Sequence, residues 1–423
     1  MIRDFWVENY LSIGERQSID FRSKTKADYL TCEVAPGVFL NKLGIFLGAN
    51  ASGKSNILFA MQNIFELMNT PKHDINEKIT TAPPFVLTSE APTKMHVSFY
   101  VDEVLYSYEV TYFQDYIEQE TLYYYPQRSK SLFYKRVYKG HELQADIKFG
   151  GSLGLKSNTQ RALIENTLNN HSVLSAYRKV ALTEDASSFS HLLQWIHDYV
   201  HKADEHNGYD VVDELEKVQN SPERHSFYLK MLQKADFNIA DFEVKTRTLP
   251  KEMLRPFEDE ELDDDFKKKL LNRITKRLVF THVNDKAVFE LERRLESRGT
   301  MKYIVALDSL YNLITGKHIY LLDELDEGLH YDLLLYFLNV FIYNSDRAQL
   351  IFTSQEIALL SEDLLNEHRD LVWFVEKSHT TAASEYTRGD AYGLHKNLSL
   401  YKSYKIGRLG AKPELSSFLI NLD

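Results

Sequence analysis

A glycine-containing segment near the N-terminus has the residue types of a phosphate-binding loop. It fits the Walker A pattern and reads Gly48, Ala49, Asn50, Ala51, Ser52, Gly53, Lys54, Ser55, Asn56. The two glycines allow backbone N–H groups to point toward an anion. Lys54 would reach the β and γ phosphates of ATP, and the Ser55 hydroxyl would coordinate Mg²⁺. An ordinary glycine turn is the alternative, which the apolar strand before the loop and the amphipathic helix after it disfavour.

Two acidic residues follow a short apolar strand in the second half of the chain. Asp323 and Glu324 come directly after residues 319–322, as in a Walker B motif. Asp323 would hold Mg²⁺, and Glu324 would accept a proton from attacking water. A pair of solvated acids capping the next helix is the alternative, and the presence of the phosphate loop favours the functional interpretation.

A serine and a glycine open a predicted helix upstream of these acids. The segment reads Ser297, Arg298, Gly299, Thr300, and apolar residues between 303 and 314 form one helix face. Such a helix N-terminus can bind an anion without a cationic side chain. Taken alone, a serine here is more often only an N-cap.

These segments require a scaffold of strands. Short apolar runs at 278–282, 319–322, 350–353 and 371–375 alternate with helices, which predicts a mostly parallel α/β sheet. Alternating, aromatic-rich runs between 95 and 138 predict an antiparallel sheet, on which we expect the tyrosines to pack. The predicted fold is an α/β P-loop NTPase head with a mixed sheet core, an antiparallel β subdomain and an inserted helical arm.

Three segments are predicted along the chain. Residues 1–157 form the N-terminal half of the head, residues 158–277 the inserted arm or lid, and residues 278–423 the C-terminal half with signature, Walker B and switch strand. The arm contains an acidic run between 258 and 265, which we expect to be a solvated face without a metal.

Composition limits the classes of protein. The chain has 50 basic and 61 acidic residues, a net charge of −11, which argues against a surface wrapped in nucleic acid but leaves a local basic patch open. The single cysteine and the charged residues after Met1 favour a reducing cytoplasm. The longest apolar run, 333–343, is much shorter than the about 20 residues of a membrane span, so no membrane partner is expected.

Together these motifs resemble the ATPase heads of the ABC type. The run 296–330 more narrowly resembles the bacterial AAA-type ATPases of the abortive-infection RloA/AbiLi group, distant relatives of RecF and SMC heads. The resemblance covers nearly the whole chain and includes residues 235–237, 349–354, 373–377 and 407–413.

The resemblance implies a homodimer, or a higher assembly, in which two heads enclose two ATP molecules. The signature residues Ser297, Arg298, Gly299 and Thr300 of one chain would then face the γ-phosphate held by Lys54 of the other. Arg298 departs from the family pattern and could add a cation there. The D-loop would consist of Glu327, Gly328, Leu329 and His330.

Gln355 stands where family members usually have a histidine. Its amide could hydrogen-bond the γ-phosphate or the attacking water, but it cannot carry a proton as an imidazole does. We therefore expect slow hydrolysis. The family position of the Q-loop, near 172–175, offers no glutamine.

The resemblance implies a nucleotide-switched regulator in an anti-phage system that controls a separately encoded effector, such as a nuclease. One alternative is a RecF-like or SMC-like head that clamps or repairs DNA, against which stand the acidic charge and the absence of long heptad arms. Another is a transporter ATPase subunit. A fused Toprim-like nuclease is not expected, because too few residues follow 377 and they contain no Asp-x-Asp pair.

Overall fold

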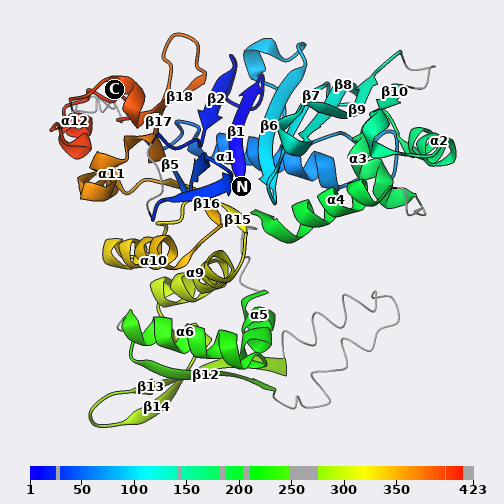
Figure 1. The fold of residues 1–423 in the computed structure, drawn as a ribbon. Coiled ribbons are helices and arrows are strands. Elements are labelled where there is room, and N and C mark those ends of the chain that lie inside the picture. Colours follow the sequence, from blue (N-terminus) through cyan, green and yellow to red (C-terminus); the bar gives the residue numbers. More distant parts are fainter. Residues whose placement is uncertain are drawn as a thin grey trace, which may run out of the picture. The chain divides into compact units, whose positions relative to one another are not determined.

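The computed structural model describes residues 1–24, 29–140, 145–180, 186–202, 210–235, 237–246, 275–395 and 397–412 (Figure 1). The chain forms two compact units. The first comprises Met1–Lys202, Gly316–Glu327 and Ile342–Asp423, and the second comprises Ala203–Thr315 and Gly328–Phe341. Residues 158–202, which we expected in the arm, therefore pack in the first unit. The acidic run from 258 to 265, Asp236 and Pro413 lie outside the described residues.

A six-stranded sheet positions the predicted motifs in the first unit. Its order is β11, β15, β16, β5, β17, β18, with all neighbours parallel except the last pair. The strands are β5 (Leu43–Gly48), β11 (Val200–Lys202), β15 (Ile319–Leu322), β16 (Gln349–Ser354), β17 (Val372–Lys377) and β18 (Ser384–Arg388). Every residue of β5, β15 and β16 is buried, as expected for parallel strands covered on both faces. The parallel sheet around these strands is confirmed.

A seven-stranded antiparallel sheet forms the other layer of this unit. Its order is β10, β9, β8, β7, β6, β1, β2. The strands are β1 (Ile2–Glu8), β2 (Gln17–Asp20), β6 (Thr93–Val101), β7 (Val104–Tyr112), β8 (Ile117–Tyr125), β9 (Ser131–Val137) and β10 (Asp146–Phe149). Helix α1 (Lys54–Asn69) contacts strands of both sheets, and its apolar residues join them in one core. The antiparallel sheet is confirmed.

Smaller elements complete the first unit. They are the hairpin of β3 (Thr31–Ala35) and β4 (Val38–Asn41), and the helices α2 (Ser157–Asn166), α3 (Val173–Ala176), α4 (Ser187–Tyr199), α11 (Asp363–Glu367) and α12 (Leu400–Lys405). No helix in the described part of the chain is long and apolar enough to span a membrane.

A buried polar network fixes the start of α3 against the antiparallel sheet. The carboxylate of Glu120 accepts a hydrogen bond from the Val173 N–H at 2.7 Å, and Arg136 donates to the His171 carbonyl at 2.7 Å. Each ring nitrogen of His171 lies within 3.2 Å of a backbone N–H and a backbone carbonyl oxygen. Burial lowers the pKa of His171 to about 4, so the ring is neutral at pH 7.

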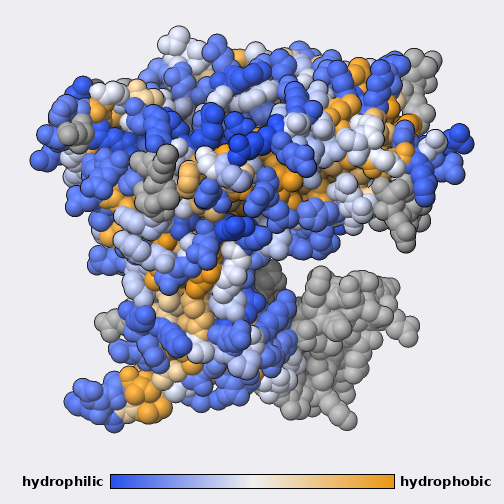
Figure 2. All heavy atoms as spheres, viewed as in Figure 1, coloured by the Kyte–Doolittle hydropathy of each residue, from blue (hydrophilic) through white to orange (hydrophobic). Residues whose placement is uncertain are grey.

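The second unit contains a three-stranded antiparallel sheet of β12 (Ile239–Thr246), β13 (Lys276–Val283) and β14 (Val288–Glu292), with α5 (Asp210–Gln219) and α6 (Pro222–Lys234) packed on it. Helix α9 (Arg298–Thr315) packs on α6. Helix α10 (Tyr331–Asn344) starts in this unit. The β13–β14 hairpin carries an exposed apolar patch that includes Val288 and Phe289 (Figure 2).

One predicted strand assignment is wrong. Residues 278–282 belong to β13 and pair antiparallel with β12 and β14, not within the parallel sheet. The reason is a tight turn after β13, in which the Asn284 side chain accepts hydrogen bonds from the Lys286 and Ala287 N–H groups at 2.9 Å. An asparagine whose side chain hydrogen-bonds to the backbone two or three residues later favours such a turn. Asn284 was therefore the residue in the sequence that indicated a hairpin.

Candidate nucleotide-binding site

The phosphate loop connects β5 to α1 and depends on both of its glycines. Gly53 has a φ of 101°, a backbone conformation that other residues rarely adopt. A Cβ atom on Gly48 would lie 2.2 Å from the Val375 carbonyl oxygen, so β17 leaves no space for a side chain there. The predicted order of strand, loop and helix is confirmed.

Lys54 is buried at the first position of α1. Its ammonium donates to the carbonyl oxygens of Gly48 and Ala49, each at 2.9 Å. Desolvation lowers the Lys54 pKa, while the negative charges of Glu324, Asp323 and Asp326 act in the opposite direction. The structure therefore brings the Walker A lysine into the electrostatic field of the Walker B acids.

Residues far along the chain hold the backbone of the phosphate loop. The Ser384 hydroxyl donates to the Ser52 carbonyl, and the Tyr386 hydroxyl donates to the Gly53 carbonyl, both at 2.6 Å. The Ser12 hydroxyl lies 2.6 Å from that of Ser384. We call Ser12, Ser384 and Tyr386 the loop brace. None of the three was predicted, because no local pattern indicates that β18 and the turn between β1 and β2 would lie beside the loop.

Thr353 at the end of β16 orients the two Walker B acids. Its hydroxyl donates to Asp323 Oδ1 at 2.6 Å and accepts from the Glu324 N–H at 2.8 Å. The Thr353 carbonyl also accepts from the Leu325 N–H at 3.2 Å. Glu324 has a φ of 48°, an uncommon conformation for a residue with a side chain. The hydrogen bonds of Thr353 therefore hold a strained turn at the end of β15.

Gln355 lies beside the predicted base. Its side-chain amide donates to Glu324 Oε1 at 2.8 Å, and its backbone N–H donates to Asp326 Oδ2 at 3.0 Å. The other oxygen of Asp326 is buried and has no hydrogen-bond partner among the described residues. The structure thus brings together Gln355 and Glu324, for which the sequence predicts separate tasks in ATP hydrolysis.

The oxygen donors at the loop suit Mg²⁺. Ser55 and Asp323 would supply a hydroxyl and a carboxylate, and Mg²⁺ commonly takes one or two such protein ligands together with phosphate oxygens and water. Across the described ranges, no group of three His, Cys, Asp or Glu side chains forms a cation site by itself. Ser55 and Asp323 would therefore hold the metal together with phosphate oxygens and water.

The predicted signature, residues 297–300, and residues 328–330 of the predicted D-loop belong to the second unit, whereas Glu327 is the last residue of a segment of the first. Ser297 caps the N-terminal end of α9, since its hydroxyl accepts from the Thr300 N–H at 3.0 Å. A Cβ atom on Gly299 would lie 3.0 Å from the Gly328 carbonyl oxygen, so these two backbones approach closely. His330 is exposed and lies 3.4 Å from an Asp332 carboxylate oxygen. A role of this surface toward a second chain stays a prediction.

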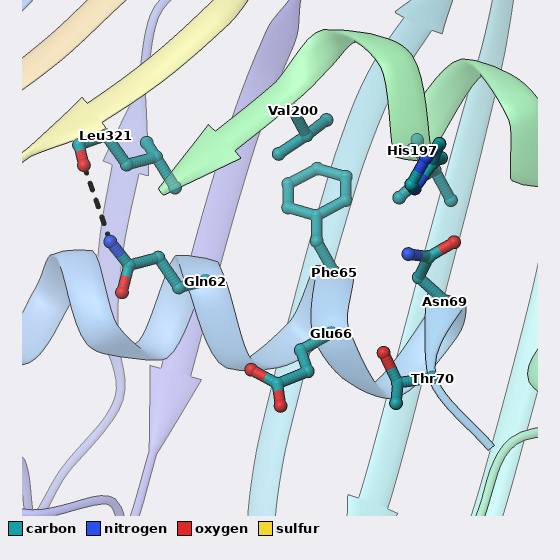
Figure 3. A pocket seen from close by; sticks show the side chains of 9 residues that line it. Gln62, Phe65, Glu66, Asn69, Thr70, His197, Val200 and Leu321 are labelled. Carbon is teal, nitrogen blue, oxygen red and sulfur yellow. Dashed lines mark hydrogen bonds between the residues drawn. The ribbon is translucent and has the colours of Figure 1, made fainter. Parts of the chain in front are cut away.

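A separate cavity of about 200 Å³ lies near the other end of α1 (Figure 3). Figure 3 shows Gln62 extending from the helix toward β15, where its amide donates to the Leu321 carbonyl at 3.4 Å. Asn69, Thr70 and His197 also line it. The phosphate loop does not contribute to this cavity.

A family model matches residues 45–361, three quarters of the chain, and is described as "AAA domain, putative AbiEii toxin, Type IV TA system". The chain belongs to this AAA-domain family. The match includes the phosphate loop, the Walker B acids and Gln355. The coarser prediction of an AAA-type P-loop domain is confirmed, while the narrower RloA/AbiLi assignment stays a proposal.

Solved SMC heads share weak structural similarity with this AAA protein. The head domain from Thermotoga maritima has 12% identity and a TM-score of 0.40, covering 92% of this chain and 98% of that one. An SMC head bound to the C-terminal winged-helix domain of ScpA has 11% identity and a TM-score of 0.40, with 96% and 99% covered. A Pyrococcus furiosus Smc head with an extended coiled coil, bound to the C-terminal domain of ScpA, has 13% identity, a TM-score of 0.35 and coverage of 96% and 98%. These TM-scores are too low to support the assignment, which rests on the family model. Comparison with curated proteins gave no match.

Proposed function

We propose that the protein binds ATP with Mg²⁺ and hydrolyses it. One observation carries the proposal: Lys54 is buried with its ammonium 2.9 Å from the Gly48 and Ala49 carbonyl oxygens of the loop, in the same compact unit as the acids Asp323 and Glu324. A buried cation beside a loop of backbone N–H groups suits a polyphosphate. A carboxylate at the end of the neighbouring strands suits the activation of water.

Each residue would have a separate task. Residues 48–56 would bind the phosphates, with Lys54 at the β and γ groups. Ser55 and Asp323 would hold Mg²⁺, which supplies charge neutralisation on the transferred phosphoryl group. Glu324 would accept the proton of the attacking water, and the amide of Gln355 would orient its carboxylate, to which it already donates at 2.8 Å.

We further propose a homodimer that acts as a nucleotide-switched regulator in bacterial anti-phage defence. The family description, which refers to a toxin–antitoxin system, supports this setting. In the dimer, residues 297–300 and 327–330 would face the partner's nucleotide. The adjoining positions of Gly299 and Gly328 are consistent with one contact surface. A separately encoded effector, such as a nuclease, would respond to the nucleotide state.

No specific observation favours the alternative of a DNA clamp. Several basic side chains in or next to strands β2 and β6 are paired with acids. Arg16 and Lys94 lie 3.6 and 3.0 Å from Glu8 carboxylate oxygens, and Arg22 lies 2.6 Å from Asp20. Such pairs reduce the positive potential that phosphate backbones require.

Calorimetric titration with Mg-ATP tests the proposal. Wild-type protein should bind ATP, and Lys54→Ala should weaken binding by about 100-fold or more, because backbone dipoles alone then face the phosphate charge. Lys94→Ala, which removes a partly buried ion pair with Glu8, is the matched control and should bind as wild type. Equal affinity of Lys54→Ala and wild type would refute the assignment of the loop.

A further inference from the structure

A cleft beside the phosphate loop extends away from the Walker B acids. It has a volume of about 760 Å³. Its walls are residues 49–52 of the loop, residues 375–379 at the end of β17, Glu385 of β18, and residues Gly407, Gly410, Ala411 and Lys412. We call residues 407–412 the C-terminal segment. All of these residues belong to the first unit.

The strand order fixes the direction in which a nucleotide would lie. Glu324 follows β15 and Gln355 follows β16, so the γ-phosphate end belongs on that side of the loop. β17 is the neighbour of β5 on the opposite side. Ligands of such sheets lie across the carboxyl ends of the strands. A triphosphate with its γ end toward β16 therefore has its nucleoside end above β17, where the cleft lies.

The C-terminal segment is held firmly as a wall of this cleft. The Ala411 N–H donates to Glu376 Oε2 at 3.3 Å, and the Ala411 carbonyl accepts from the Tyr404 hydroxyl at 3.0 Å. Gly410 has a φ of 59°, and a Cβ atom there would lie 2.1 Å from the same Glu376 oxygen. A side chain at this position would displace the Glu376 carboxylate, and the positive φ also favours glycine.

The polar groups of the cleft suit a ribonucleoside. The carboxylates of Glu376 and Glu385 can accept hydrogen bonds from ribose hydroxyls, as acids do in other nucleotide sites. Lys377 and Lys412 supply donors on the same walls. Lys412 is exposed, and its ammonium donates to the Lys405 carbonyl at 3.1 Å.

We infer that this cleft holds the ribose and base of the nucleotide, which makes the C-terminal segment part of the nucleotide site. The inference rests on the proposed ATP binding and adds the position of the nucleoside. The lining of the cleft includes neither Lys54 nor Ser55, so the two parts of the ligand can be tested separately.

Calorimetry on the full chain with two ligands, Mg-ATP and Mg-tripolyphosphate, separates these parts. Wild type should bind ATP more tightly, because tripolyphosphate lacks the nucleoside. Lys412→Ala and Gly410→Ala should weaken ATP binding by about tenfold, the value of one hydrogen bond to a charged group, and leave tripolyphosphate binding unchanged. Lys405→Ala is the matched control and should bind ATP as wild type does. The Lys412 ammonium donates to the backbone carbonyl of Lys405, which the substitution keeps.

The outcomes distinguish this inference from the proposed function. Unchanged ATP affinity in both Lys412→Ala and Gly410→Ala, with tight binding of both ligands by wild type, would overturn the nucleoside cleft alone. A wild type that bound neither ligand would refute nucleotide binding itself. Lys412→Ala alters an exposed side chain, so its result stands even if the Gly410→Ala backbone does not fold.

Discussion

The Thr353 hydroxyl lies 2.6 Å from Asp323 Oδ1 and, at the same time, 2.8 Å from the Glu324 backbone nitrogen. One buried hydroxyl thus sets the positions of the proposed metal ligand and the proposed base. It does so from the strand next to the one that carries them.

Replacement of Thr353 should separate catalysis from binding. Thr353→Val keeps the shape of the side chain but loses both hydrogen bonds, so kcat should fall by about 10- to 100-fold while the Kd for ATP changes little. Thr353→Ser should restore most of the rate. Steady-state kinetics with calorimetry provide the measurement, and a wild-type kcat in Thr353→Val would exclude the orienting role.

Glu324→Gln should bind ATP and fail to hydrolyse it. The amide cannot accept the proton of the attacking water, so kcat should fall by about 100-fold or more, while Asp323 still holds the metal. If the proposed dimer forms around ATP, this variant should elute as a dimer with ATP and as a monomer without it. Turnover at the wild-type rate would show that another group is the base.

Gln355 should set the pH dependence of turnover. Its amide does not titrate, so the wild-type rate should show no inflection near the reference histidine pKa of about 6.5. Gln355→Ala should lower kcat by about tenfold, because the hydrogen bond to Glu324 is lost. Gln355→His should introduce an inflection in that range and raise the rate above it. A wild-type inflection that persists in Gln355→Ala would point to a histidine elsewhere.

His171 should make the fold less stable in mild acid. Its pKa is lowered to about 4 in the folded protein, against about 6.5 when unfolded. Above pH 6.5 neither the folded nor the unfolded state binds the proton, so the free energy of unfolding is at its highest. Between pH 6.5 and 4 only the unfolded state binds the proton, so the free energy of unfolding decreases as the pH is lowered. The loss from pH 7 to 5 should be about 2 kcal/mol.

Denaturant unfolding at several pH values measures this loss. His171→Gln should reduce the pH dependence, although its stability at pH 7 will also be lower. His73→Gln, which changes an exposed ring, should keep the wild-type slope. His201, whose pKa burial also lowers to about 4, should account for part of the remaining slope. An unchanged slope in His171→Gln would contradict the assignment.

The parts of the fold with a local signal were predictable from the sequence. The phosphate loop and the Walker B acids each lie between an apolar strand and a helix, and this short-range pattern predicts both their chemistry and their elements. The buried face of α1 was predictable from the helical spacing of its apolar residues. The antiparallel sheet was predictable from alternation alone.

The remaining features depend on contacts between distant residues. Nothing near Ser384 or Tyr386 indicates that their hydroxyls reach Ser52 and Gly53. Strand 278–282 was misplaced because apolar alternation does not distinguish a hairpin partner from a strand of the central sheet. The cleft beside β17 depends on where the C-terminal segment returns, which no periodicity encodes.

The loop brace has a consequence for the order of synthesis. The phosphate loop is complete in sequence at Ser55, yet the hydroxyls that hold its backbone belong to Ser384 and Tyr386. Both neighbours of β5, β16 and β17, are also translated late. When only the first half of the chain has left the ribosome, every residue of the proposed phosphate loop is present, but the hydroxyls and strands that hold the loop are not. We therefore expect a nucleotide to stabilise the protein only after nearly the whole polypeptide has been synthesised.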